Sequence, residues 1–255
     1  MIVAATLLAG AASVLAAAAL TLTLLAGLVR QLVSVSAGLL LATAVLHLIP
    51  EAFASGIDGR ILGWTLLIGL IGFFLLEKLA VVRHSHHHEG DGHAHHHGHD
   101  HEEAGPGGLV ILVGDTIHNF GDGVMIAAAF MADPVLGWLT TAAIAAHEIP
   151  QEIGDFIVLL NAGYTRARAL LYNVLSGLSS VLGGVLGYFA LERSQTLLPH
   201  VLMLATASFI YVALADLVPD LHRDSRQRGE WRAQFALMMA GVAVVAVVTA
   251  QLHGH

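Results

Sequence analysis

Eight long apolar segments, separated by short polar stretches, dominate the pattern of hydrophobic and polar positions. They cover residues 3–28, 33–54, 61–82, 108–131, 135–160, 168–191, 198–219 and 233–252. Each has about 20 residues or more, the length that a helix needs to cross a hydrocarbon core about 30 Å thick. The runs are continuous rather than alternating, which favours helices over the strands of a membrane barrel. The pattern therefore predicts an all-α polytopic membrane protein, with eight transmembrane helices in a single domain over residues 1–255.

The composition agrees with a membrane protein and excludes other classes. The 255 residues are 56% hydrophobic and 12% charged, whereas soluble domains are about a quarter charged. The absence of cysteine excludes both a disulfide framework and a thiolate metal site. The formal net charge of −8 gives no reason to expect nucleic acid as a partner. We expect the lipid bilayer to be the main surroundings of the chain.

The basic residues between the apolar segments fall mostly on one side of the predicted membrane. With both termini outside, the inside loops hold Arg30, Lys78, Arg83, Arg166, Arg168, Arg223, Arg226, Arg228 and Arg232, and the outside loops hold only Arg60 and Arg193. Cytoplasmic loops carry the excess of basic residues in membrane proteins. We therefore expect an integral multi-pass protein of the cell (inner) membrane with both termini outside.

Residues 84–107 form a histidine-rich stretch between the third and fourth segments. The surrounding residues 83–108 hold ten of the seventeen histidines, together with glycine and acidic residues. This composition predicts a disordered loop, which faces the cytoplasm in the topology above. Imidazole binds zinc and similar ions, so we interpret the loop as a loose metal collector; a plain hydrophilic linker is the alternative. The candidate auxiliary ligands are His86, His87, His88, His95, His96, His97, His99 and His101.

The second and seventh segments carry similar polar motifs. VLHLIPEAF (45–53) and ALADLVPDL (213–221) each have a polar residue, two apolar residues, a proline and an acid. Five spans apart, the two helices run in opposite directions. The similarity indicates an inverted repeat that relates the first three spans to the last three, as in many transporters.

The fourth and fifth segments carry polar side chains at helical spacing within apolar runs. His118 and Asp122 are four residues apart in the fourth segment, with Asn119 beside them, and the fifth segment holds AAHEIPQEIGDF (145–156). Residues four apart share one face of a helix, so His147 aligns with Gln151 and Glu148 aligns with Glu152, with Asp155 following. Carboxylates at this depth are costly and mark functional sites by default. Since a short turn joins the two segments, we expect their polar stripes to meet.

The donor types in these stripes indicate a transition-metal site. Imidazole nitrogen, carboxylate oxygen and amide oxygen together suit Zn²⁺ and other first-row divalent ions, and suit Mg²⁺ or Ca²⁺ less well. Pro150 should kink the fifth helix and free the carbonyl of Ala146, because proline has no N–H to donate. Gly121 and Gly123 should permit close approach to the fourth helix.

These motifs resemble those of the ZIP family of divalent-metal transporters. HNFGDG (118–123) is similar to that family's fourth-span signature, and HEIPQE (147–152), running on into IGDF, is similar to the fifth-span signature of its LIV-1 branch. HLIPEA (47–52) and FIYVALADLVPDL (209–221) are similar to its second and seventh spans. With the histidine-rich loop, the resemblance covers nearly the whole chain, in a short form of prokaryotic type.

The resemblance implies a 3+2+3 bundle that forms a homodimer and moves metal, zinc above all, toward the cytoplasm. Zinc, or alternatively Fe²⁺, Mn²⁺ or Cd²⁺, is then the cargo rather than a catalytic cofactor. By position the resemblance matches the primary metal site to His118, Asp122, His147 and Gln151, and an adjacent second position to Asn119 and Glu148. The candidate pathway residues are His47, Glu51, Glu152 and Asp155.

Two departures from the family pattern bear on metal preference. Gln151 stands where the LIV-1 motif usually has histidine, and an amide oxygen is a weaker zinc ligand than imidazole, which leaves iron or manganese as the alternative main substrate. The sixth span reads NVLSGLSSVLGG (173–184), with serines where many members have a glutamate that bridges two metals. Asn173 is a further candidate for the pathway or for an interhelical hydrogen bond.

Other functions remain open from the sequence. HEIPQ is a near match to HExxH, in which two histidines hold zinc and glutamate is the general base, so an intramembrane zinc metalloprotease is the enzyme alternative. A cation-diffusion exporter also has histidine-rich cytoplasmic loops, but such exporters have six spans and a cytoplasmic C-terminal domain. A metal receptor or sensor without transport is the third alternative.

Overall fold

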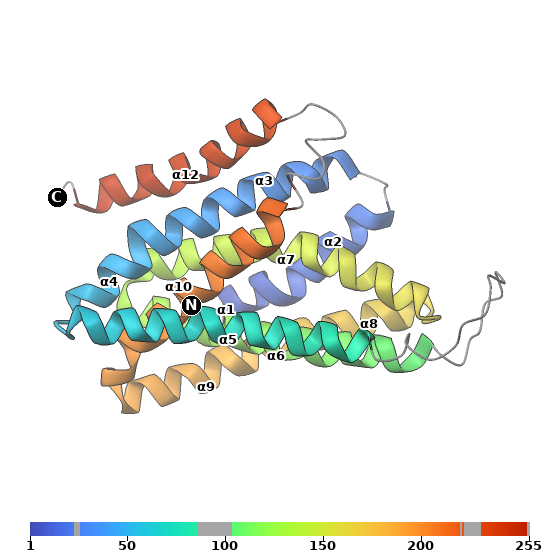
Figure 1. Ribbon diagram of the computed structural model, residues 1–255, viewed down its shortest axis with the longest axis horizontal. Coiled ribbons are helices and arrows are strands. Elements are labelled where there is room, and N and C mark those ends of the chain that lie inside the picture. The colour runs from blue at the N-terminus through green and yellow to red at the C-terminus, as the bar shows by residue number, and fades with distance from the viewer. Residues whose placement is uncertain (23–25, 86–103, 220, 222–230, 254–255) are drawn as a thin grey trace.

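The computed structural model describes residues 1–22, 26–85, 104–219, 221 and 231–253, and within these ranges it consists of helices joined by short turns, without a strand (Figure 1). The eight auxiliary histidines of the sequence analysis lie outside the described residues. The fold class is therefore confirmed as all-α. Figure 1 shows the long helices side by side along the long axis, with α12 at one edge and α9 at the other.

The eight apolar segments of the sequence are helical over their described residues. Four are made of consecutive helices: α1 (Ile2–Leu7), η1 (Leu8–Ala12) and α2 (Ser13–Leu22); α3 (Ala26–Thr43), η2 (Ala44–Leu48) and α4 (Ile49–Ala54); α8 (Arg166–Gly177) and α9 (Ser179–Arg193); and α10 (Leu198–Tyr211) with η4 (Val212–Leu217). The others are α5 (Gly59–Ser85), α6 (Ala104–Ala132), α7 (Pro134–Asn161) and α12 (Trp231–His253), and the short η3 (Gln195–Leu197) precedes α10.

Six of these segments are long and apolar enough to cross a membrane. They are Ile2–Leu20, Leu28–Ala54, Gly59–Leu76, Arg166–Arg193, Gln195–Ala215 and Trp231–Gln251. The other two long helices, α6 and α7, have 29 and 28 residues and carry the buried polar side chains of the candidate site. The count of eight transmembrane helices stays a prediction that rests on these two.

The helix packing agrees with the inverted repeat. α12 packs along α3, and α10 packs along α5, so the eighth span meets the second as the seventh meets the third. Likewise α9 packs on α6, as α2 packs on α7. The inverted repeat relates the first, second and third spans to the sixth, seventh and eighth, and the fourth span to the fifth. It therefore converts each of these helix pairs into the other pair named with it. α6 and α7 lie between the two halves and pack against each other.

The two proline motifs share a local distortion as well as a sequence pattern. A π-helical turn, η2, precedes Pro50 in the second span, and another, η4, precedes Pro219 in the seventh. π-turns inside α-helices are uncommon and occur frequently at functional sites. Their equivalent positions before two prolines support a structural repeat in addition to the short sequence match.

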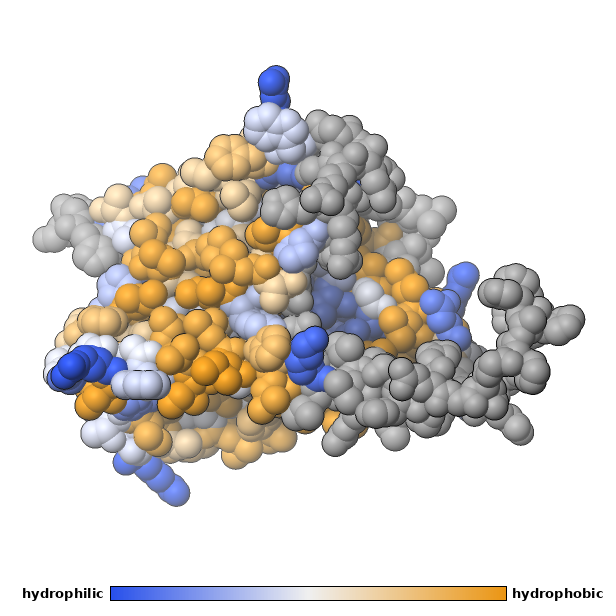
Figure 2. Space-filling view, in the orientation of Figure 1, coloured by the Kyte–Doolittle hydropathy of each residue, from blue (hydrophilic) through white to orange (hydrophobic). Residues whose placement is uncertain are grey.

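Apolar side chains cover much of the outer surface. On α5 one face presents Ile61, Trp64, Ile68, Ile71 and Leu75, each more than half exposed. Their spacing places them on one stripe of the helix. Figure 2 shows apolar residues over much of the visible described surface. A patch this extended is unusual on a water-soluble monomer and suits contact with lipid tails.

Close contact between α6 and α9 depends on Gly123. A Cβ atom at Gly123 would overlap the carbonyl oxygen of Ser180, and one at Gly183 would overlap that of Phe120. Small residues let transmembrane helices approach closely in this way. The expectation for Gly121 was wrong, because a Cβ there would meet nothing within 4 Å. Gly121 points to open space since it lies two residues from Gly123, on a different side of the helix.

This difference yields a matched pair of substitutions. We expect Gly123→Ala to destabilise the protein by about 1–3 kcal/mol, because overpacking forces the two helix backbones apart. Gly121→Ala should leave stability unchanged or slightly raised. Thermal unfolding of the detergent-solubilised protein would measure both. Equal melting temperatures for the two variants would contradict the close packing of α6 on α9.

Candidate metal centre

A tight turn holds α6 and α7 as antiparallel neighbours. Asp133 stands alone between the two helices and is the N-cap of α7, where its carboxylate accepts hydrogen bonds from the amides of Val135 at 2.8 Å and Leu136 at 3.0 Å. An aspartate at this position satisfies amides that lack helical partners. Pro134 follows at the first helical position, where no N–H is needed. The turn therefore fixes α6 against α7 and allows their polar faces to meet.

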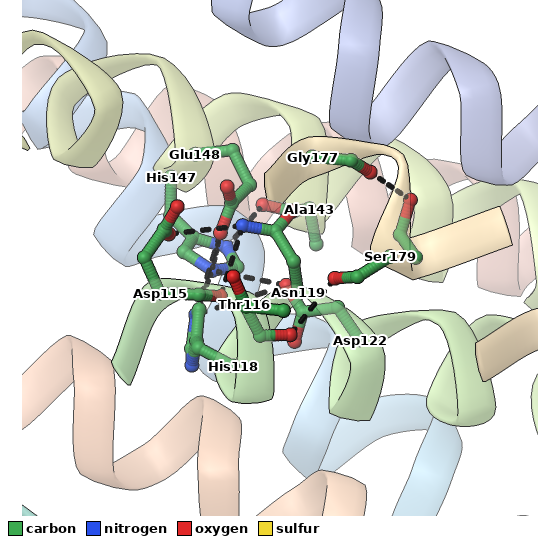
Figure 3. Close-up of polar contacts among 11 residues, drawn as sticks. Asp115, Thr116, His118, Asn119, Asp122, Ala143, His147, Glu148, Gly177 and Ser179 are labelled. Atoms are coloured by element: carbon green, nitrogen blue, oxygen red, sulfur yellow. Dashed lines mark hydrogen bonds and ion pairs between the residues drawn. The ribbon is translucent and has the colours of Figure 1, made fainter. Parts of the chain in front are cut away.

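Two residues from each helix converge on one point between them (Figure 3). The His118 Nε2 atom lies 3.3 Å from Glu148 Oε1 and 3.8 Å from Asp122 Oδ2. The His147 Nε2 atom lies 3.5 Å from Glu148 Oε1, 3.6 Å from Asp122 Oδ2 and 3.5 Å from His118 Nε2. We call these four residues the histidine cluster.

The spacing in the histidine cluster matches that of a tetrahedral zinc site. Zn–N and Zn–O bonds of about 2.0–2.1 Å place tetrahedral ligand atoms about 3.3–3.4 Å apart. The five distances above range from 3.3 to 3.8 Å, so a small contraction would complete the geometry. Two imidazoles and two carboxylates form an acceptable ligand set for Zn²⁺ and for other first-row divalent ions.

Burying the carboxylates of the histidine cluster costs free energy when no cation is bound. Asp122, His147 and Glu148 are each 2% exposed or less. Both carboxylate oxygens of Asp122 and both of Glu148 accept no hydrogen bond from the described residues. Buried polar atoms are almost always paired, and an unpaired buried charge is strongly unfavourable. A divalent cation would neutralise the carboxylates and occupy their free lone pairs.

A backbone contact fixes the orientation of one imidazole. The Nδ1 atom of His147 lies 3.2 Å from the carbonyl oxygen of Ala143, one turn earlier in α7. If Nδ1–H donates to this carbonyl, Nε2 is left unprotonated and faces the cluster. A second hydrogen bond of this kind is what sets the tautomer and direction of metal-binding histidines.

A second group of acids adjoins the first and shares one member with it. Asp115, Glu148 and Glu152 each offer a carboxylate oxygen within 4.8 Å of the others, and all three are buried. We call these three residues the carboxylate cluster. The Oδ2 atom of Asp115 and both oxygens of Glu152 accept no hydrogen bond from the described residues. Oxygen-only sites favour harder cations than mixed nitrogen and oxygen sites do.

Asp115 was not among the residues selected from the sequence. It lies one turn before Asn119, whose Nδ2 atom donates to Asp115 Oδ1 at 2.9 Å and to the Asp115 carbonyl at 3.3 Å. The i, i+4 relation to Asn119 is a signal that could have found it. Asn119 thus positions a carboxylate of the second cluster.

The serines of the sixth span bond to helix backbones and hydroxyls. Ser179 donates to the carbonyl of Thr116 at 2.8 Å, and Ser180 donates to the carbonyls of Thr6 and Gly177. The hydroxyl of Ser176 lies 3.0 Å from that of Thr116. The contacts of Ser176 and Ser179 tie α6 to α8 and α9, as Figure 3 shows for Ser179 and Thr116, and Ser180 ties α9 to α1. The serines of the sixth span therefore connect neighbouring helices through their hydroxyls.

Comparison with known protein families decides the classification. A family model of the ZIP zinc transporters matches residues 80–249, more than half of the chain. The chain belongs to the ZIP family. Since this is a family of transporters, the match decides against the metalloprotease alternative and against any enzyme. With the six apolar spans, it also makes the chain an integral multi-pass membrane protein.

Curated relatives of this ZIP chain carry the names of zinc transporters. ZIP13 of Pongo abelii is 33% identical over 236 residues, which are 85% of this chain and 65% of the relative. ZIP6 of Homo sapiens is 40% identical over 136 residues, 52% of this chain and 18% of the relative. The transporter foi of Drosophila melanogaster is 35% identical over 139 residues, 54% of this chain and 20% of the relative. The chain thus spans about a fifth of the length of foi and ZIP6 and less than two thirds of ZIP13.

The remaining predicted residues of this ZIP chain lie outside the two clusters. Gln151 and Asp155 are half-buried on α7, one turn beyond His147 and Glu152 respectively. Glu51 lines a pocket of about 330 Å³ between the ends of α4, α6 and α10, together with Met131 and Leu202.

Two further polar residues of the sequence analysis have identified partners. His47 is buried, and its Nε2 atom pairs with the hydroxyl of Thr249 on α12. Asn173 on α8 is 1% exposed, and its Nδ2 atom donates to the Glu152 carbonyl at 3.5 Å. The Oδ1 atom of Asn173 accepts no hydrogen bond from the described residues. Asn173 therefore adjoins the carboxylate cluster, whereas His47 connects the second and eighth spans.

Proposed function

We propose that this ZIP-family chain moves a divalent transition metal, zinc in the first place, across the membrane toward the cytoplasm. The observation that carries the proposal is the near-tetrahedral arrangement of two imidazoles and two carboxylates between α6 and α7. The zinc transporters among its relatives support zinc as the cargo. Iron, manganese and cadmium are the alternative substrates that Gln151 leaves open.

The histidine cluster is the proposed primary position for the ion. His118, Asp122 and His147 keep the roles that the family resemblance assigns to them. Glu148 joins them, because its Oε1 atom lies within 3.5 Å of both imidazoles. Gln151, half-buried one turn further along α7, is the proposed contact for the ion as it leaves or enters this position. Asn119 contributes by holding Asp115.

The carboxylate cluster is the proposed next position. Glu148 belongs to both clusters, so an ion can move between them by exchanging the imidazoles for Asp115 and Glu152 while it stays bound to Glu148. Two adjacent positions of different donor type avoid one very deep energy well, which would hold the ion and stop transport. Asp155 follows on α7 and continues the proposed path, and the histidine-rich loop would collect ions at its cytoplasmic mouth.

The burial of the two helices, together with the basic residues, supports the proposed direction. On the Asp133 side of the histidine cluster, the residues of α6 from Met125 to Phe130 are at most 9% exposed. On the other side His118 is 21% exposed. We assign the sealed end to the outside, since the excess of Lys and Arg lies at the opposite ends of the helices. His47 and Glu51 would then lie in the outer half of the membrane. The proposal also includes the homodimer that the family resemblance implies.

Flux into liposomes tests transport and selectivity together. We expect the purified protein to admit zinc, with cadmium, iron and manganese as graded competitors. Gln151→His should shift the preference toward zinc, because imidazole is a better zinc ligand than an amide. The measurement is the initial rate of uptake of each metal under competition, with protein-free liposomes as the baseline. Absence of flux for all four metals would refute the transport proposal, and unchanged selectivity in Gln151→His would remove Gln151 from the pathway.

A further inference from the structure

Pro150 leaves one backbone carbonyl of α7 without its helical donor. α7 continues as one helix from Pro134 to Asn161 through this proline. In an α-helix the amide at position i donates to the carbonyl at i−4, and proline has no N–H. The missing donor at position 150 belongs to the carbonyl of Ala146, directly before His147. A backbone acceptor at this depth requires another partner.

A side chain from a distant span supplies that partner. The hydroxyl of Ser36 on α3 donates to the carbonyl oxygen of Ala146 at 2.6 Å, across 110 positions of sequence. Ser36 is fully buried. α3 packs along α7, so the contact joins the second span to the fifth at the edge of the histidine cluster.

The same hydroxyl also lies 2.7 Å from the carbonyl of Leu32 in its own helix. A hydroxyl has a single hydrogen, so the two acceptors compete for it. The Leu32 carbonyl already receives the backbone N–H of Ser36 as part of the α-helix, whereas the Ala146 carbonyl has lost its amide to Pro150. A hydrogen bond from the Ser36 hydroxyl therefore stabilises the protein more at Ala146, because it satisfies a carbonyl that no helical amide reaches.

We infer that Ser36 is a positioning residue for the metal site, with its hydroxyl standing in for the missing amide of Pro150. The bond fixes the turn of α7 that contains Ala146, and so fixes where the next two residues, His147 and Glu148, present their ligand atoms. Ser36 touches neither metal nor ligand atoms; it acts through the backbone of α7. The inference rests on the proposed function of the histidine cluster.

Ser34 provides a matched control for the loss of this hydroxyl. It lies on the same helix and is also fully buried, and within the described part of the chain its hydroxyl donates to the carbonyl of Arg30 in its own helix, at 3.1 Å, and to no other helix. Ser34→Ala thus removes a buried hydroxyl without touching α7. We expect Ser36→Ala to raise the zinc KM for uptake about threefold to tenfold, and Ser34→Ala to leave it at the wild-type value.

The decisive comparison combines Ser36→Ala with Pro150→Ala. An alanine at position 150 restores an amide for the Ala146 carbonyl, which makes the Ser36 bond redundant. We therefore expect Ser36→Ala to have little effect on zinc binding in the Pro150→Ala background, although it weakens binding in the wild-type background. Equilibrium zinc binding to the purified full-length proteins measures all four members of the cycle, even where Pro150→Ala slows transport.

Two results would overturn the positioning role. One is an equal zinc affinity in Ser36→Ala and Ser34→Ala. The other is a loss of affinity in Ser36→Ala that is the same in both backgrounds, as loss of packing alone would give. Zinc flux of the wild-type protein distinguishes failure of the Ser36 role from failure of the proposed function. If wild type transports zinc and Ser36→Ala behaves as wild type, only the positioning role of Ser36 fails. If wild type neither binds nor transports any of the four metals, the proposed function fails first.

Discussion

Alanine in place of His118 or His147 is expected to reduce zinc uptake into vesicles by more than about 100-fold. Loss of an outer partner of a metal ligand already costs about 10- to 100-fold in affinity, and each of these residues supplies a ligand nitrogen directly. The remaining three groups of the histidine cluster cannot complete a four-ligand site. Uptake of radioactive zinc into membrane vesicles, normalised to inserted protein, would measure the loss.

His200 is the matched control for these two substitutions. It lies at the start of α10, where its Nδ1 atom is 2.9 Å from the hydroxyl of Thr65 on α5, and it belongs to neither cluster. His200→Ala should therefore retain uptake within about a factor of three, the scale of one ordinary hydrogen bond. Wild-type uptake in both His118→Ala and His147→Ala would exclude the histidine cluster as the transport site.

Glu148→Gln is expected to abolish zinc transport. Glu148 is the member common to both clusters, so the change weakens the primary position and the proposed transfer together. Its buried carboxylate lies near Asp115, Asp122 and Glu152, but its Oε1 atom is also 3.3 Å from His118 Nε2 and 3.5 Å from His147 Nε2. The substitution relieves repulsion among the acids but also removes a partner of both imidazoles, so the stability of the metal-free protein should change little.

Two further acids separate these effects. Glu152→Gln affects only the carboxylate cluster, so zinc should still bind while transport slows. Glu192 lies exposed on α9, and Glu192→Gln should change neither transport nor stability. Zinc uptake and thermal unfolding in the absence of metal are the two measurements. A Glu148→Gln variant that transports zinc like wild type would contradict the role given to the shared carboxylate.

Buried carboxylates of this kind are common at membrane sites that bind cations. Proteins retain buried charged groups at functional sites although other side chains would be more stable there. Among the described residues, the carboxylate oxygens of Asp122, Glu148 and Glu152 accept no hydrogen bond, and the contacts of Asp122 and Glu148 are with the two imidazoles of the same cluster, which fits a site that exists for its cation. The same carboxylates in a purely structural role would be expected to have donors, as Asp133 has at the turn before α7.

The sequence by itself determined the helices, the family motifs and the chemistry of the site. The length of an apolar run and the spacing of residues four apart are local properties, and they predict helices and helix faces without knowledge of the fold. The pairing of His118 with Asp122, and the meeting of α6 with α7 through a short turn, followed from such local rules. The free carbonyl of Ala146 was also predictable, because it depends only on Pro150.

Only the tertiary structure decided which side chains meet across helices. Successive residues of a helix differ by about 100° in direction, so the choice between Glu148 and Gln151 as partner of the two imidazoles depends on how α7 is rotated against α6. Packing of α6 on α9 through Gly123 and of α7 on α3 sets that rotation. The partner of the Ala146 carbonyl, Ser36, is 110 positions away, and no local pattern distinguishes it from Ser34. Contacts between distant segments depend on the packing of the whole bundle, and for that reason they appear only in the folded protein.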